Sequence, residues 1–226
     1  MNNYFFNYGI IGSSGKLGSE VKSVLSNNGG TIVFYHNRTG HFEITKPEVL
    51  IDCSLPDAFE KTIFYADKFK IPLIIATTGL SDEQFDQLKI LSESVPVIQS
   101  NNFSIGIQVL LYLVDTAKNY LPGWDIEIEE IHHRSKKDKP SGTAKTIQKV
   151  FKDNNVNISS LRLGNIIGDH SVHFATSGEI LTIKHSVNSR RIFAQGILKA
   201  VRFVLRKKNG FFNFSDVIHS DIEYEI

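Results

Sequence analysis

Two histidines and several cations lie close together between a predicted strand and a predicted helix. The run is His132-His133-Arg134-Ser135-Lys136-Lys137, and Ser141-Gly142-Thr143 follows at the start of the predicted helix. Backbone N–H groups at a helix start can hold an anion, and a lysine adds a charge-assisted hydrogen bond. Histidine also transfers protons near neutral pH. These residues predict a site for a small anionic ligand, such as a carboxylate, with proton transfer beside it.

Two other interpretations of this segment stay open. Its basic residues alone are typical of a solvated loop, although the helix-capping Ser141-Gly142-Thr143 favours the anion site. The other is a metal site formed by His132 and His133, but adjacent side chains on a strand point to opposite faces. We therefore expect no metal.

A glycine-rich segment lies between the first predicted strand and the first predicted helix. It reads Gly12-Ser13-Ser14-Gly15-Lys16-Leu17-Gly18. Glycine permits a tight turn and close backbone approach, and the helix start offers N–H groups to a pyrophosphate. The spacing G-x-x-G-x-x-G is not the commonest one. The segment predicts dinucleotide binding, and the alternative is a turn that only links two elements.

Further candidate cofactor contacts follow later strands. After the second strand come His36, Asn37 and Arg38, with no carboxylate for the adenine ribose; Arg38 is either a contact for the 2′-phosphate of NADPH or a solvated loop residue. Ala76-Thr77-Thr78-Gly79 follows the fourth strand and either lines the nicotinamide or only forms a turn. Ser100-Asn101-Asn102-Phe103-Ser104 follows the fifth, where Phe103 packs on the cofactor or on the next helix.

The first half of the chain alternates predicted strands and helices, which is typical of a parallel, doubly wound sheet. The segment between Tyr35 and Val49 shows no helical pattern, so we expect a short loop there. The predicted strands are Tyr4–Ile11, Thr31–Tyr35, Val49–Cys53, Leu73–Ala76 and Pro96–Gln99, and the helices are Gly15–Leu25, Pro56–Phe69 and one capped by Ser81.

The second half predicts an α+β unit with a mostly antiparallel sheet. Its predicted elements are helices Ile105–Tyr120 and Arg190–Leu205 and strands Trp124–Ile131, Ser159–Gly164, Ser171–Ala175 and Ile180–His185. We expect a dinucleotide-binding domain of residues 1–103 with 201–226, and a substrate-binding and oligomerisation domain of residues 104–200.

Composition excludes several classes of protein. The chain has 226 residues, 41% hydrophobic and 22% charged, which is typical of a folded protein with one or two domains. A net charge of +1 predicts no binding to nucleic acid or to a membrane surface. The lone Cys53 excludes an intrachain disulfide and lies in an apolar run, as a buried residue would. With no signal peptide or long apolar span visible, we expect a soluble cytoplasmic protein.

The central segment, read with the glycine loop, resembles the dihydrodipicolinate reductase family. The matching pattern is Glu127-Ile128-x-Glu130-x-His132-x-x-x-Lys136-x-Asp138-x-Pro140-Ser141-Gly142-Thr143-Ala144, and it is long and ungapped. The resemblance covers nearly the whole chain. It extends to Thr77-Thr78-Gly79, Asn102-Phe103-Ser104, Gly168-Asp169-His170, Gly178-Glu179, His185, Ser189-Arg190 and Phe193-Ala194-x-Gly196.

The resemblance implies reduction of 4-hydroxy-tetrahydrodipicolinate, a dicarboxylate, to tetrahydrodipicolinate by NADH or NADPH in lysine and diaminopimelate biosynthesis. It implies that His132 is a proton donor or acceptor, that Lys136 is the proton donor, and that His133 binds substrate. Gly142 and Thr143 would hold a carboxylate through backbone N–H groups. The cofactor would contact Gly12–Leu17, Arg38, Ala76–Thr78 and Ser100–Phe103. The resemblance further implies a homotetramer formed through the second-domain sheet.

Some positions depart from the family pattern. Ala76 replaces the usual glycine, Lys16 replaces arginine, Asp169 replaces glutamate, and the loop after the second strand is short. The short loop leaves the choice between NADH and NADPH open. Two alternatives are a nucleotide-binding protein without turnover and a homoserine or aspartate dehydrogenase. The intact run from His132 through Lys136 to Ser141-Gly142-Thr143 favours the reductase over both.

Overall fold

The chain forms two compact units in the computed structural model, which describes residues 5–38, 40–151 and 156–223. The first unit comprises Met1–Phe103 with Arg190–Ile226, and the second comprises Ser104–Ser189. This division differs from the expected boundary at residue 200. Helix α6 (Arg191–Val204) buries an apolar face in the core of the first unit, so residues 190–200 belong there.

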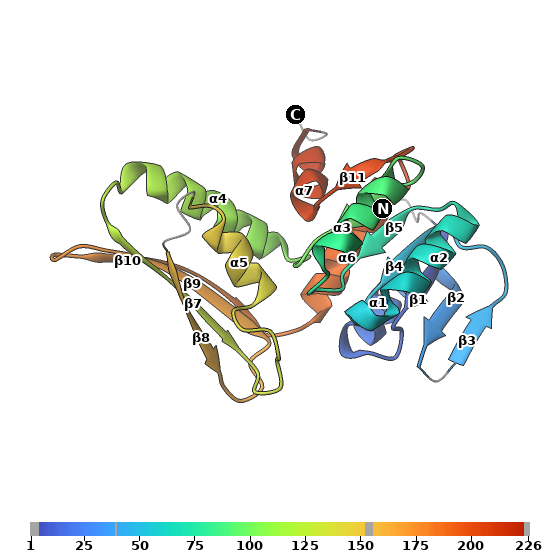
Figure 1. Cartoon of the computed structure of the whole chain (residues 1–226), viewed down its shortest axis with the longest axis horizontal. Helices are drawn as coiled ribbons and strands as arrows, with labels where there is room; N and C mark the ends of the chain where they lie inside the picture. The colour runs from blue at the N-terminus through green and yellow to red at the C-terminus, as the bar shows by residue number, and fades with distance from the viewer. Residues whose placement is uncertain (1–4, 39, 152–155, 224–226) are drawn as a thin grey trace. The chain divides into compact units, whose positions relative to one another are not determined.

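The first unit is built on a mostly parallel sheet, as predicted (Figure 1). Its strands are β1 (Phe6–Ile11), β2 (Gly30–Asn37), β3 (Gly40–Glu43), β4 (Val49–Asp52), β5 (Leu73–Ile75), β6 (Pro96–Gln99) and β11 (Gly210–Phe212), in the order β11-β6-β5-β4-β1-β2-β3. Strand β3 pairs antiparallel with β2, whereas the sequence predicted only a short loop. The turn at Arg38 lets the chain fold back on β2 and cover the edge of the sheet.

Helices cover both faces of this sheet. They are α1 (Lys16–Ser26), the short 3-10 helix η1 (Pro56–Ala58), α2 (Phe59–Phe69), α3 (Asp82–Ser92), α6 and α7 (Phe214–Glu223). Alternate residues of β4 point to opposite faces, so Ile51 packs with α1, α6 and α7 while Leu50 packs with α2 and α3. The predicted cap of α3 is confirmed, because Ser81 and Gln84 form a capping box.

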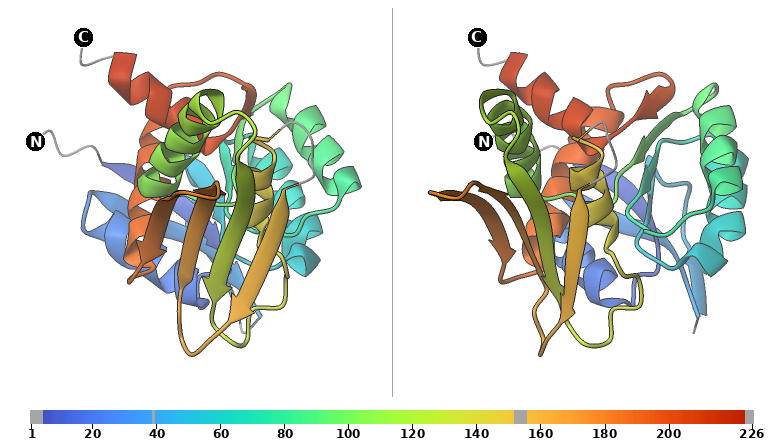
Figure 2. Two further views of the ribbon diagram at one scale, coloured as in Figure 1. Left: turned by 90° about the vertical axis from the view of Figure 1, so that its left-hand side faces the viewer. Right: turned by 60° about the vertical axis from the view of Figure 1, so that its left-hand side comes forward.

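Over its described residues, the second unit is a four-stranded sheet with two helices, α4 (Ile105–Tyr120) and α5 (Gly142–Gln148). Its strands are β7 (Asp125–His132), β8 (Asn157–Arg162), β9 (Gly168–Ala175) and β10 (Ile180–Val187), in the order β10-β9-β7-β8. The left view of Figure 2 shows this sheet face on, with α5 behind it. The predicted mostly antiparallel sheet is confirmed, and β7 with β8 is its parallel pair.

The core of the second unit lies between the helices and one face of the sheet. Ile128 on β7 and Val172 on β9 are paired across the sheet, and both pack against Leu110 of α4 and Ile147 of α5. Ser104 precedes α4 as expected, but its hydroxyl contacts His185 Nε2 at 3.3 Å and does not cap the helix. Over the described residues, we find no helix with the length and apolar character required to cross a bilayer.

Candidate functional site

The glycine loop of the first unit has a conformation that depends on glycine. Gly12 has a φ of +80°, and a Cβ there would lie 2.9 Å from the backbone of Cys53 and Ser54. A Cβ on Gly18 would lie 2.2 Å from the carbonyl oxygen of Gly12, so helix α1 packs directly on the loop. These approaches fit the tight turn and close helix packing of a dinucleotide site.

The start of α1 lacks a side-chain cap. Its N-cap residue is Gly15, which has no side chain to form a cap hydrogen bond. The loop in front of it is fixed by Asn37 Nδ2, which donates to the buried Ser13 Oγ at 3.1 Å, while Ser14 and Lys16 are exposed. The helix N-terminus therefore suits a pyrophosphate, which would accept hydrogen bonds from these backbone N–H groups.

Cations gather where β2 ends. Arg38 is exposed in the turn after the strand. Lys61 Nζ on α2 donates to His36 Nε2 at 3.1 Å, and His36 Nδ1 is buried with no hydrogen-bond partner. Burial and the charge of Lys61 lower the pKa of His36. The end of β2 thus carries two basic side chains, Arg38 in the following turn and Lys61 beside His36.

A buried carboxylate organises the loops after β4 and β5, and sequence reasoning missed it. Asp52 is fully buried at the end of β4 and accepts hydrogen bonds from Thr62 Oγ1 at 2.8 Å, Thr77 Oγ1 at 2.9 Å and Ser54 N at 2.8 Å. The hydroxyl of Thr77 is therefore committed to Asp52, whereas Thr78 is exposed. An aspartate directly after three apolar residues of a predicted strand was the available signal.

The segment after β6 is held by its own side chains. Ser100 Oγ donates to the carbonyl oxygen of Asn102 at 2.8 Å, and Gln99 Nε2 donates to Asn101 at 3.5 Å. The ring of Phe103 is buried against Phe214, with 5.1 Å between centroids. Phe103 is thus a core residue of the first unit.

In the second unit, alternation along β7 places a carboxylate and a histidine on its buried face. Glu130 and His132 follow Ile126 and Ile128 at every second position, and His132 Nδ1 is hydrogen-bonded to Glu130 Oε2. Arg162 on β8 pairs in register with His132 and donates to both carboxylate oxygens of Glu130, at 3.0 and 2.9 Å. Sequence reasoning identified His132 but missed Glu130 and Arg162 as its partners.

These contacts set the protonation of the group. Burial raises the pKa of Glu130, but hydrogen bonds from Arg162 and His132 outweigh it and lower the pKa to about 2. Burial lowers the pKa of His132, against the raising effect of Glu130. Burial and the charge of His132 lower the pKa of His170 to about 3, so His170 is neutral at physiological pH. Glu130 is therefore ionised at neutral pH, beside a His132 whose pKa is below that of free histidine.

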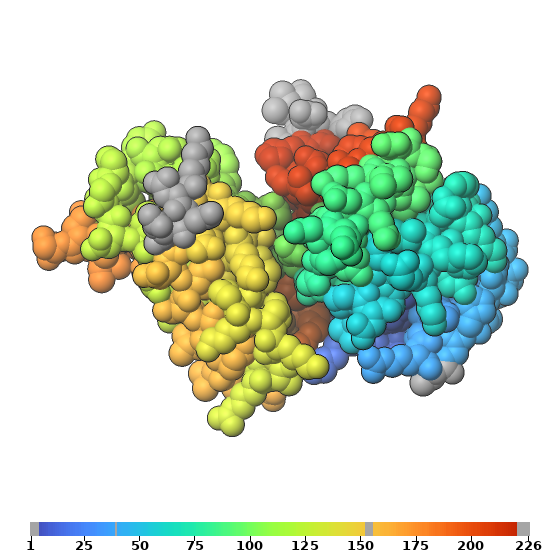
Figure 3. Space-filling model, in the orientation of Figure 1, coloured from blue at the N-terminus to red at the C-terminus, as the bar shows by residue number. Residues whose placement is uncertain are grey.

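The loop between β7 and α5 contains an ion pair between two of its own side chains. This loop lies on the surface of the second unit in Figure 3. Lys136 Nζ forms an ion pair with Asp138 Oδ1 at 2.7 Å. Burial raises the pKa of Asp138, but Lys136 and the backbone N–H of Gly142 lower it by a larger amount. Ser141 Oγ caps α5 through Ala144 N at 3.1 Å, and Thr143 is buried.

His133 differs from His132 in its surroundings. It is half-buried beyond the end of β7, and its Nδ1 contacts Ser135 Oγ at 2.9 Å. No set of three or more His, Cys, Asp or Glu side chains in the described part of the chain is arranged to hold a metal ion.

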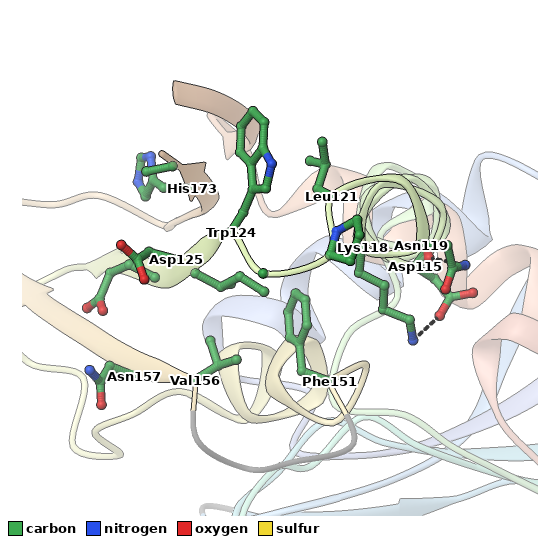
Figure 4. Close-up of a pocket in the computed structure, with 15 residues that line it drawn as sticks. Asp115, Lys118, Asn119, Leu121, Trp124, Asp125, Phe151, Val156, Asn157 and His173 are labelled. Atoms are coloured by element: carbon green, nitrogen blue, oxygen red, sulfur yellow. Dashed lines mark hydrogen bonds and ion pairs between the residues drawn. The ribbon is translucent and has the colours of Figure 1, made fainter. Parts of the chain in front are cut away.

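An open hollow lies at the opposite end of β7, around Trp124 and Phe151 (Figure 4). Lys118 on its wall is paired with Asp115 at 2.6 Å, as the dashed line shows. The hollow contains none of the predicted site residues. It lies at Asp125, where β7 begins, whereas His132 is the last residue of that strand.

Comparison with known proteins identifies the family. Family models described as "Dihydrodipicolinate reductase, N-terminus" and "Dihydrodipicolinate reductase, C-terminus" match residues 6–103 and 106–218. The 4-hydroxy-tetrahydrodipicolinate reductase of Thermosipho africanus is 47% identical over 211 residues, covering 93% of this chain and 97% of that protein. The enzyme of the same name from Caldanaerobacter subterraneus subsp. tengcongensis is 39% identical and covers 76% of each chain. The chain belongs to the dihydrodipicolinate reductase family.

A solved structure agrees with this fold. The dipicolinate-bound dihydrodipicolinate reductase of Paenisporosarcina sp. TG-14 matches with a TM-score of 0.74 at 24% identity, over 93% of this chain and 98% of that one. The predicted α/β fold, with a Rossmann-like parallel sheet and a second, mostly antiparallel sheet, is confirmed.

Proposed function

We propose that this chain reduces 4-hydroxy-tetrahydrodipicolinate to tetrahydrodipicolinate with NADH or NADPH, in lysine and diaminopimelate biosynthesis. Membership of the family and the names of its relatives support the reaction. The conversion replaces a ring hydroxyl by hydrogen, so it consumes a hydride and a proton and releases water. The nicotinamide supplies the hydride when bound, and the protein supplies orientation, charge and the proton.

The ion pair between Asp138 and Lys136 is the observation that supports the assignment of the substrate site. The Asp138 carboxylate is held by Lys136 Nζ at 2.7 Å, and the backbone N–H of Gly142 contributes to the lowered pKa of Asp138. Lys136, which we expect to bind a substrate carboxylate, is therefore already paired with a carboxylate. We infer that Lys136, Gly142 and Thr143 hold a carboxylate of the substrate, and that His133 adds a further contact.

Two residues are assigned to proton transfer. Lys136 carries exchangeable protons on a side chain only 20% exposed, so we assign it as the proton donor. His132 keeps Nε2 for exchange because Nδ1 is bonded to Glu130, and Gly168, which has no side chain, lies beside Nε2. We assign His132 as the second donor or acceptor.

The cofactor is assigned to the first unit. We propose that the loop Gly12–Leu17 holds the pyrophosphate, and that Ala76–Thr78 and Ser100–Phe103 line the nicotinamide side, with Thr77 and Phe103 contributing backbone. Arg38, together with Lys61, favours the 2′-phosphate of NADPH, because neither is paired with a carboxylate in the described contacts. The two units thus take the expected roles of cofactor domain and substrate domain.

We further propose a homotetramer in the cytoplasm. Leu161 on β8 and Ile180 and Leu181 on β10 are 43%, 70% and 42% exposed, and both strands are edges of the second sheet. Apolar side chains on exposed edges suit burial against other subunits. Cys53 is a free thiol, as is usual in a reducing compartment. Light scattering of the purified chain tests the assembly.

The function is tested by following oxidation of NADH and of NADPH, with substrate generated from pyruvate and aspartate semialdehyde. We expect oxidation that depends on substrate and is faster with NADPH. Folded protein that binds either cofactor without oxidising it would support the nucleotide-binding alternative. Reduction of NAD⁺ or NADP⁺ with homoserine or aspartate as the substrate would support the other dehydrogenases.

A further inference from the structure

Arg162 connects parts of the second unit that lie far apart in the sequence. Its side chain is 14% exposed and Glu130, its partner, is 0% exposed. Besides its two bonds to Glu130, Arg162 Nε donates to the carbonyl oxygen of Lys136 at 3.3 Å, and Nη2 donates to that of Asp138 at 2.6 Å. One guanidinium thus holds the carboxylate behind His132 and the backbone that carries Lys136.

Glu130 is satisfied on both oxygens. Oε2 accepts from His132 Nδ1 and Arg162 Nη1, and Oε1 accepts from Arg162 Nη2 and from Ser141 N at 3.3 Å. A buried carboxylate that accepts from a histidine fixes which ring nitrogen carries the proton and which way the ring faces. A buried ion pair is costly to desolvate and gives little net stability, so its presence here calls for another role.

We propose that Glu130 and Arg162 are positioning residues for the reaction: Glu130 fixes the tautomer and orientation of His132, and Arg162 holds the Lys136–Asp138 loop at a set distance from it. Neither residue contacts the substrate in this scheme. The expected changes in kcat and KM rest on the proposed function, whereas the expected tautomer and orientation of the His132 ring do not.

Glu130→Gln is the informative first variant, because it keeps the shape and removes the charge. Both oxygens of Glu130 accept hydrogen bonds from N–H donors. In a glutamine, one of these oxygens is replaced by an NH₂ group, so in either orientation of the amide an N–H donor faces another N–H donor. We expect kcat to fall by about 10²-fold, in the range of general acid–base effects, with the KM for cofactor unchanged. The limb of the pH profile that belongs to His132 should move to lower pH, since Glu130 raises the pKa of that ring.

Arg162→Lys tests the other half. A lysine keeps the positive charge beside Glu130, but one ammonium cannot reproduce a fork that reaches five acceptors, the carbonyl oxygen of Leu161 included. We expect a raised KM for substrate, because the Lys136 loop is released, and an unshifted His132 limb. Glu130→Gln should thus change kcat and the pH profile, and Arg162→Lys should change KM. A shared loss of folding would not produce this difference between the two variants.

Glu127→Gln is the matched control. Glu127 lies on the same strand, and its carboxylate accepts one hydrogen bond, from Ser159 Oγ at 2.6 Å, at an exposed position. It should have the wild-type kcat and pH profile. If Glu130→Gln lowers activity only in proportion to its folded fraction, with the pH limb unmoved, the pair is structural and the proposal is wrong.

Nitrogen NMR of histidine-labelled protein tests the proposal without turnover. Wild-type His132 should carry its proton on Nδ1 and titrate below free histidine; in Glu130→Gln this preference should be lost and the pKa should fall further. An Nε2-protonated His132 in the wild type overturns the proposal even if neither variant folds. A chain that shows the expected tautomer but no reductase activity contradicts the proposed function alone.

Discussion

Replacement of Gly18 by alanine is expected to abolish tight cofactor binding with only a moderate loss of stability. The added Cβ would lie 2.2 Å from the Gly12 carbonyl oxygen, whereas ordinary contact begins at 3.4 Å. Helix α1 and the loop must therefore separate by about 1 Å. A misplacement of this size can lower a reaction rate about 10²-fold, and we expect a loss of similar size in cofactor affinity because the same backbone N–H groups must face the pyrophosphate. Overpacking of this kind costs about 1–3 kcal/mol, and each kcal/mol lowers Tm by roughly 2–4 °C in a chain of this size.

The assay is direct titration of NADPH and NADH into the variant, with thermal unfolding in parallel. The control is Gly178→Ala, because a Cβ there meets nothing within 4 Å. We expect the control to bind like the wild type and Gly18→Ala to bind at least about 10²-fold more weakly. Unchanged affinity in a folded Gly18→Ala variant would refute the reasoning, because the loop would then not form the cofactor site.

Three other variants test the second unit. His132→Gln should lower kcat far more than cofactor affinity, since its role is in the chemical step; equal losses in steady-state kinetics and in NADPH titration would remove that role. Lys136→Ala should raise KM for substrate and lower kcat, and an unchanged KM would exclude it from the anion site. His170, whose pKa is lowered to about 3, binds its proton more readily in the unfolded chain. Stability should therefore be full above pH 6.5 and decline below it by up to about 1.4 kcal/mol per pH unit towards pH 3. Denaturation by urea at several pH values should show a smaller decline in His170→Phe, and an identical slope would contradict the assignment.

The sequence by itself determined most of the fold. Local signals identified β6 as Pro96–Gln99 and α4 as Ile105–Tyr120 with the bounds the structure has, because proline, serine and apolar periodicity act within a few residues. The pair β2–β3 was missed because β3 is only 4 residues long and has no alternating apolar pattern. The position of α6 in the first unit also required the tertiary structure, since an amphipathic helix does not specify which sheet covers it.

Some residues of the candidate site were likewise identified from the sequence, whereas their partners were found only in the structure. Spacing and residue type identified the glycine loop, His132 and Lys136, because these groups are contiguous and chemically distinctive. The partners of those groups are distant in sequence: Arg162 reaches Glu130 only through the parallel pairing of β7 with β8, and Thr77 reaches Asp52 across two neighbouring strands. Hydrogen bonds of this kind depend on which strands lie side by side, so only the tertiary structure decided which side chains hold the reactive ones in place.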